Sequence, residues 1–85
     1  MRVTTMRTLW SPQEESFLQL AFAAIPRIIE LIAAFPAEER AGALEAAERH
    51  YTVAAQNFGC NEAGARTCVS DVMRTLRTRV EAVAA

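Results

Sequence analysis

Three side chains in this sequence, Cys60, Cys68 and His50, belong to the types that bind metal ions or act as nucleophiles. The eight-residue spacing of the two cysteines fits no familiar zinc pattern, and no fourth ligand is evident. A cysteine–histidine nucleophile pair would also need an orienting residue and an oxyanion donor, and no pattern identifies either. We therefore expect no catalytic residue, metal site, cofactor or small-molecule substrate, and we expect both cysteines to be buried structural residues.

A second set of side chains suits recognition. Thr67, Ser70 and Arg74 are separated from one another by three, four and seven positions, and Arg66 precedes Ser70 by four, which places these residues on one face of a helix. Residues 60 to 80 contain four arginines and two acids, an excess of two positive charges. This face either contacts a negatively charged partner or is simply solvated.

The composition indicates one domain built from helices, residues 1–85. Of the 85 residues, 52% are hydrophobic, and only three are glycine and three proline, which suits a single helical core. The net charge of −1 gives no overall attraction to nucleic acid or to an anionic membrane. Because the N-terminus lacks the apolar stretch and cleavage site of a signal peptide, we expect a cytoplasmic protein.

The N-terminal part divides into an arm, residues 1–10, and a kinked hydrophobic helical segment, residues 11–35. Ser11 and Glu14 form a capping box at the start of this segment. Pro26 predicts a break or kink near Ile25, because proline removes an amide and crowds the preceding turn. The apolar run from Phe17 to Phe35 is nearly long enough to span a bilayer, but Arg27 near its centre would cost about 2.5–3.5 kcal/mol to insert, so we expect no membrane span.

The remaining residues, 36–85, predict two or three further helices. Residues 37 to 58 form one helix, or two if Thr52 caps a new one. Gly59 ends this element in a left-handed conformation, and Asn61 caps the last helix. The expected apolar stripes are Leu44, Ala47, Tyr51, Ala54 and Phe58 on the first element, and Ala65, Cys68, Val72, Leu76 and Val80 on the last.

The stretch AAQNFGCNEAGARTCVSDVMRTLR resembles the helix-turn-helix DNA-binding domains of LuxR-type regulators and of region four of bacterial sigma factors. The resemblance rests on Ala55, Phe58-Gly59-Cys60, Glu62, Arg66, Val69 and Leu76. It implies that Asn61 caps a recognition helix in the major groove of double-stranded DNA. The implied DNA contacts are Glu62, Ala63, Arg66, Thr67 and Ser70, with Arg74 and Arg77 near phosphates. Gly64 departs from the family, which usually has a threonine at this place.

The apolar face of the N-terminal segment predicts self-association. Ile28, Leu31, Ile32 and Phe35 lie at helical spacing and offer more apolar surface than a contact between two helices consumes. We therefore expect a symmetric homodimer through these four residues.

The overall prediction is an all-α fold of four to five helices. A hydrophobic N-terminal helical hairpin packs against a helix-turn-helix-like C-terminal half. Two functions fit this fold: a DNA-binding transcription regulator, or a helical dimer that mediates protein interaction without contacting nucleic acid.

Overall fold

The computed structural model describes residues 11–84, which form three helices, α2 (Pro12–Ala33), α3 (Ala37–Asn57) and α4 (Glu62–Ala84). The all-α class is confirmed. The prediction of four to five helices is wrong for this part of the chain, and so is the N-terminal hairpin, because residues 12–33 form a single helix. The predicted arm, residues 1–10, lies outside the described residues.

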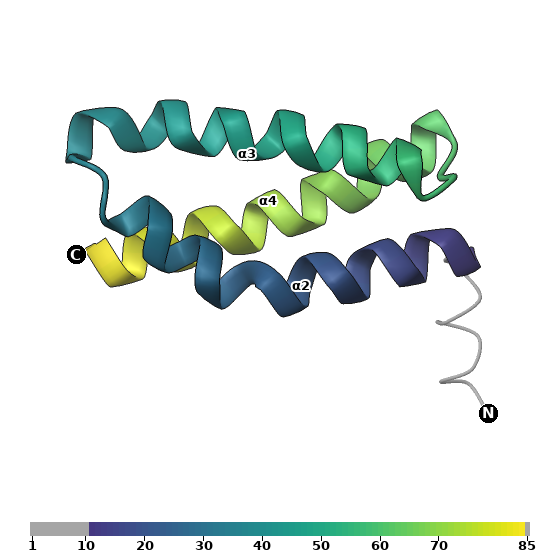
Figure 1. Cartoon of the computed structure of the whole chain (residues 1–85), viewed down its shortest axis with the longest axis horizontal. Helices are drawn as coiled ribbons and strands as arrows, with labels where there is room; N and C mark the ends of the chain where they lie inside the picture. Colours follow the sequence, from purple (N-terminus) through teal and green to yellow (C-terminus); the bar gives the residue numbers. More distant parts are fainter. Residues whose placement is uncertain (1–10, 85) are drawn as a thin grey trace.

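The three helices run in alternating directions along the long axis of an elongated bundle, which is horizontal in Figure 1, so that α3 is antiparallel to both α2 and α4. The bundle measures 44 × 27 × 17 Å along its principal axes. Helix α4 packs against both other helices, and its contact with α2 is the most extensive in the bundle. The contact between α2 and α3 is the least extensive, so these two helices leave part of their facing surfaces uncovered.

Helix α2 begins at the predicted capping box. Ser11 Oγ accepts a hydrogen bond from the Glu14 amide at 3.2 Å, and Glu14 Oε1 accepts one from the Ser11 amide at 2.9 Å. Of the break or kink predicted near Ile25, the break is wrong, because the helix continues through Pro26 to Ala33. A proline inside a helix lowers stability by about 3 kcal/mol. Ile25 before it and Ile29 after it are both buried, and burial of each isoleucine stabilises the fold by about 1.5–3 kcal/mol, which offsets this cost.

Helix α3 is one helix, not two. The alternative start at Thr52 does not form, because the Thr52 hydroxyl donates to the Glu48 carbonyl one turn earlier, inside the helix. At the other end, Arg40 Nη2 donates to the Ala33 carbonyl at 3.2 Å. This bond satisfies a carbonyl in the last turn of α2 and fixes the short connection between the two helices.

The connection between α3 and α4 is a Schellman turn centred on Gly59. The Cys60 amide donates to the Ala55 carbonyl at 3.2 Å, and the Gly59 amide donates to the Gln56 carbonyl at 3.0 Å. Gly59 has a φ of 92°, which confirms its predicted left-handed conformation. Asn61 then caps α4, as predicted, by accepting from the Gly64 amide at 2.7 Å.

The core lies along α4, between the other two helices. The predicted stripe of α4 is confirmed, since all five of its residues are buried, and Val69 and Met73 widen it into a face that contacts both neighbours. Helix α2 contributes Phe17, whose ring meets those of Tyr51 and Phe58 edge-on, with centroids 6.3 and 6.0 Å apart. By length and composition α2 could also cross a membrane, but in the bundle it supplies one wall of this core.

Candidate functional site

The side chains that could act as nucleophiles or metal ligands, Cys60, Cys68 and His50, do not form one cluster. Cys60 and Cys68 are buried near the start of α4, as predicted. His50 lies on the exposed side of α3, where its ring packs edge-on against Tyr51. Among residues 11–84, no three histidine, cysteine or acidic side chains lie close enough together to hold a metal ion.

The environment of the two thiols favours their neutral form. Burial raises the pKa of Cys68 from its ordinary value of 9.0 to about 11, and the negative charges of Glu14 and Asp71 add to this effect. Burial and the Glu14 carboxylate also raise the pKa of Cys60. Because the thiolate is the reactive form of cysteine, both side chains are poor nucleophiles near neutral pH.

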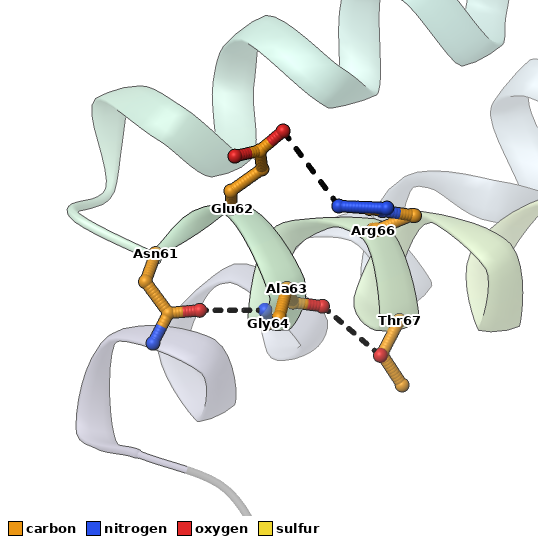
Figure 2. A network of polar contacts seen from close by, with 6 residues as sticks. All are labelled: Asn61, Glu62, Ala63, Gly64, Arg66 and Thr67. Atoms are coloured by element: carbon orange, nitrogen blue, oxygen red, sulfur yellow. Dashed lines mark hydrogen bonds and ion pairs between the residues drawn. The ribbon is translucent and has the colours of Figure 1, made fainter.

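Four of the five side chains that the helix-turn-helix resemblance assigned to the DNA groove, Glu62, Ala63, Arg66 and Thr67, lie on the first two turns of α4 (Figure 2), and Ser70 follows on the third turn. Arg66 turns toward Glu62, with 3.7 Å between Arg66 Nη2 and Glu62 Oε2, and both side chains are largely exposed. The Thr67 hydroxyl donates to the Ala63 carbonyl at 3.0 Å. Arg66 thus has an acidic partner, and the Thr67 hydroxyl proton is used within the helix.

These residues continue into a groove between α3 and α4, which we name the α3–α4 groove. Its volume is about 760 Å³, and it is lined by Arg66, Ser70, Arg74 and Arg77 from α4 and by Thr52 and Gln56 from α3, among others. Most of the predicted DNA-contacting side chains are therefore brought onto one surface.

The charge of the α3–α4 groove is balanced. Besides its three arginines it is lined by three glutamates, Glu48, Glu62 and Glu81. Arg77 Nη2 lies 3.1 Å from Glu48 Oε1, and Arg74 pairs with Asp71 one turn before it. The local excess of positive charge in the sequence does not become an unpaired basic surface.

A second groove, of about 700 Å³, lies between the C-terminal half of α2 and the N-terminal half of α3. We name it the α2–α3 groove. One wall carries the bulky side chains Ile28, Leu31 and Phe35, while the other carries small residues, Gly42, Ala43 and Ala46. Leu31 is 57% exposed and Phe35 is 42% exposed, so large apolar side chains here face solvent.

The four residues predicted to form a dimer interface all line this groove, but they are not equivalent. Ile32 is only 5% exposed and belongs to the core of the bundle. Ile28 is half-buried, and only Leu31 and Phe35 present much of their apolar surface outward. Adjacent positions of one helix differ in this way because successive residues point about 100° apart.

Tyr51 forms part of the floor of the α2–α3 groove. Its ring is buried, and its hydroxyl makes no hydrogen bond within residues 11–84. Burial also raises the pKa of this hydroxyl. An unpaired buried hydroxyl costs about 1–3 kcal/mol, so a partner group that reached it would gain a hydrogen bond.

Acidic side chains line one end of the α2–α3 groove, and a basic side chain, Arg27, adjoins Ile28 at the other end without lining the groove. Glu38 and Glu39, in the first turn of α3, line it near the α2–α3 connection. Arg27 lies one turn before Leu31 on the same side of α2, toward the other end. Within residues 11–84, none of these three side chains forms an ion pair with another residue.

Glu14 and Gly64 make a close contact that no pattern in the sequence indicates. A β-carbon built on Gly64 would lie 1.8 Å from Glu14 Oε2, so only glycine fits here while the Glu14 carboxylate keeps its place. Glu14 is the one buried charged residue of the described chain. Its contact explains the glycine that departs from the helix-turn-helix pattern.

Comparisons with protein-family models, with curated proteins and with solved structures found no match to this chain. Any function must therefore be argued from the two grooves and from the residues that line them.

Proposed function

We propose that this chain is a cytoplasmic protein-interaction module that binds a helical surface through the α2–α3 groove and has no catalytic role. The observation that carries this proposal is the exposure of Leu31 and Phe35 opposite a wall of α3 whose middle part is glycine and alanine, between Glu38 and Glu39 at one end and His50 and Tyr51 at the other. Large apolar side chains on one wall and small residues on the other form a track that admits a helix, which is a common mode of protein recognition. Contiguous apolar surface of this kind marks interaction sites on soluble proteins.

DNA binding through the α3–α4 groove is the second candidate. It is favoured by the gathering of Arg66, Ser70, Arg74 and Arg77 on one surface of α4. Two observations favour the interaction module over it. The first is that the three arginines have acidic partners, so binding phosphate would mean giving up existing ion pairs.

The shape of the α3–α4 pair is the second of these observations. Helices of 21 and 23 residues run in opposite directions along the bundle, adjacent at their connection and diverging toward the C-terminal end of α4, and neither is close to perpendicular to the other (Figure 1). The two helices of a helix-turn-helix unit instead meet at about 90–120°, which frees the recognition helix to enter the major groove. A long antiparallel hairpin keeps the first turns of α4 close to the body of the protein.

Site-specific photocrosslinking in cells tests the proposed function. With benzoylphenylalanine in place of Phe35, we expect a covalent adduct to one defined protein, identified by mass spectrometry. The adduct should disappear when Leu31→Arg is added. The matched control places the same crosslinker at Val83, which is exposed on α4 and does not line the groove. An equal yield of adducts from both positions would count against an interaction site in this groove.

Fluorescence anisotropy tests the second candidate. We expect no binding of a randomised duplex DNA pool even at about 50 mM salt, where contacts to phosphate are strongest. Binding that falls for Arg77→Ala on all sequences, and for Arg66→Ala on a preferred sequence, would instead support DNA recognition.

A further inference from the structure

We infer that the partner in the α2–α3 groove is a second copy of this chain, placed by a two-fold axis that passes close to Leu31. This inference rests on the proposed function, since it names the occupant of the same groove. It depends on three properties of the groove: its shape, the position of the charges in and beside it, and the exposure of Leu31.

The first property is that the groove is complementary to itself in shape. An interface with two-fold symmetry uses the same surface on both copies. One wall supplies Leu31 and Phe35, and the other supplies Gly42, Ala43 and Ala46. When two such surfaces meet face to face, the bulky side chains of each α2 lie over the small residues of the α3 of the partner subunit.

The second property is that the charges in and beside the groove, Glu38 and Glu39 in it and Arg27 beside it, would pair with one another under a two-fold axis. Arg27 lies about one helical turn, roughly 6 Å, before Leu31. Glu38 and Glu39 lie beyond Leu31, toward the α2–α3 connection. A two-fold axis near Leu31 exchanges the two ends, so that Arg27 of each copy faces the acidic end of the other. Each of these charges lacks an ion pair within residues 11–84, and the symmetric contact supplies one.

The third property is that Leu31 lies where the two surfaces would meet first. It is more than half exposed, although the residues on both sides of it in the groove, Ile28 and Ile32, are at least partly buried. On the axis, the two Leu31 side chains would contact each other and lose this exposed surface. This burial gives the dimer an apolar centre with a charged rim, the arrangement common to stable interfaces.

Charge reversal in purified chains tests the symmetric arrangement. We expect the wild type to pass from monomer to dimer between about 1 and 200 µM in sedimentation equilibrium. Arg27→Glu, and separately the pair Glu38→Arg with Glu39→Arg, should each raise the homodimer Kd by about tenfold, because both symmetric contacts become repulsive. An equal mixture of the two variants should form a heterodimer, since one of its two contacts then joins the wild-type charges and the other joins the reversed ones.

Two controls keep this test decisive. Arg79→Glu reverses an exposed charge on α4, a helix that contributes no residue to the groove, and it should leave the Kd unchanged. Circular dichroism verifies that each variant keeps its helical content. A chain carrying all three reversals should dimerise like the wild type, because both symmetric contacts would again join opposite charges.

The outcomes separate this inference from the proposed function. A wild type that stays monomeric across the whole range overturns the second-copy assignment, while an adduct from position 35 to a different protein would still support the groove as an interaction site. A dimer whose triple-reversal chain fails to recover the wild-type Kd overturns the two-fold arrangement.

Discussion

At the scale of single residues, the contact between Glu14 and Gly64 shows tertiary structure overriding helix propensity. Alanine is favoured over glycine inside a helix by about 1 kcal/mol. At Gly64, however, a methyl group would displace the Glu14 carboxylate, which accepts the Ser11 amide in the capping box. Losing a cap costs about 1 kcal/mol, so the two effects oppose each other at similar magnitude.

A double-mutant cycle measures the coupling energy between Glu14 and Gly64. We expect Gly64→Ala to leave the free energy of unfolding unchanged or lower in the wild-type background, and to raise it when Glu14→Ala has already removed the carboxylate. Urea unfolding of the four proteins gives the coupling energy, which should be about 1 kcal/mol. An equal gain from Gly64→Ala in both backgrounds would show that the two residues do not interact.

The raised pKa of Cys68 predicts how the free energy of unfolding depends on pH. The pKa of Cys68 is about 11 in the folded chain and returns toward 9.0 on unfolding, so above pH 9 the folded state holds the proton more tightly. The contribution of this thiol to stability is therefore fully present below pH 9 and is lost as the pH rises toward 11. Urea unfolding at pH 8, 9.5 and 10.5 should show this decline, and Cys68→Ala should make it shallower. A flat profile would mean that the thiol is accessible to water.

At the scale of the elements, the connection from α3 to α4 depends on one backbone conformation. Gly59→Ala should destabilise the chain by about 1 kcal/mol or more, because a residue with a side chain is strained at a φ of 92°. Gly42→Ala is the matched control. Its β-carbon meets no atom within 4 Å on a regular turn of α3, so this change should stabilise by about 0.5–1 kcal/mol. Thermal unfolding that moved in the same direction for both variants would contradict the Schellman turn.

The ends of the elements were predictable because their signals are local. Ser11 with Glu14, Gly59 and Asn61 each act through bonds to residues three to five positions away, and a sequence displays such spacings directly. The effect of Pro26 was not predictable in this way. The helix continues through it because Ile25 and Ile29 are buried against other parts of the bundle, which only the folded chain reveals.

The candidate sites were predictable only in outline. The sequence grouped Ile28, Leu31, Ile32 and Phe35 on one face, and the structure places all four along one groove. Which of the four belong to the core depends on which side of α2 packs against α4, and the sequence of α2 alone does not specify that side. Likewise, the arginines of α4 form one surface as expected, but the partner of Arg77 comes from α3, 29 residues away along the chain. No periodicity within one helix reveals such a partner.

At the scale of the whole molecule, substitutions at two neighbouring positions of α2, Leu31 and Ile32, should distinguish loss of association from loss of folding. Leu31→Arg places a charge on the exposed side of the groove, so the chain should keep its helical content and melt as a folded monomer. Ile32→Arg would bury an unpaired charge in the core and should unfold the chain. Circular dichroism combined with light scattering distinguishes the two results. A folded Ile32→Arg variant would show that this residue does not belong to the core.

The extensive pairing of α2 with α4 also has a consequence for synthesis on the ribosome. The first and last helices of residues 11–84 share the largest interface, so the apolar stripe of α2 lacks its main covering partner until α4 has been translated. At about 5–20 residues per second, the 23 residues of α4 take roughly one to five seconds to make. For that time Ile25 and Ile29 of a nascent chain lack this covering helix, so we expect chaperones that hold exposed apolar segments to bind it.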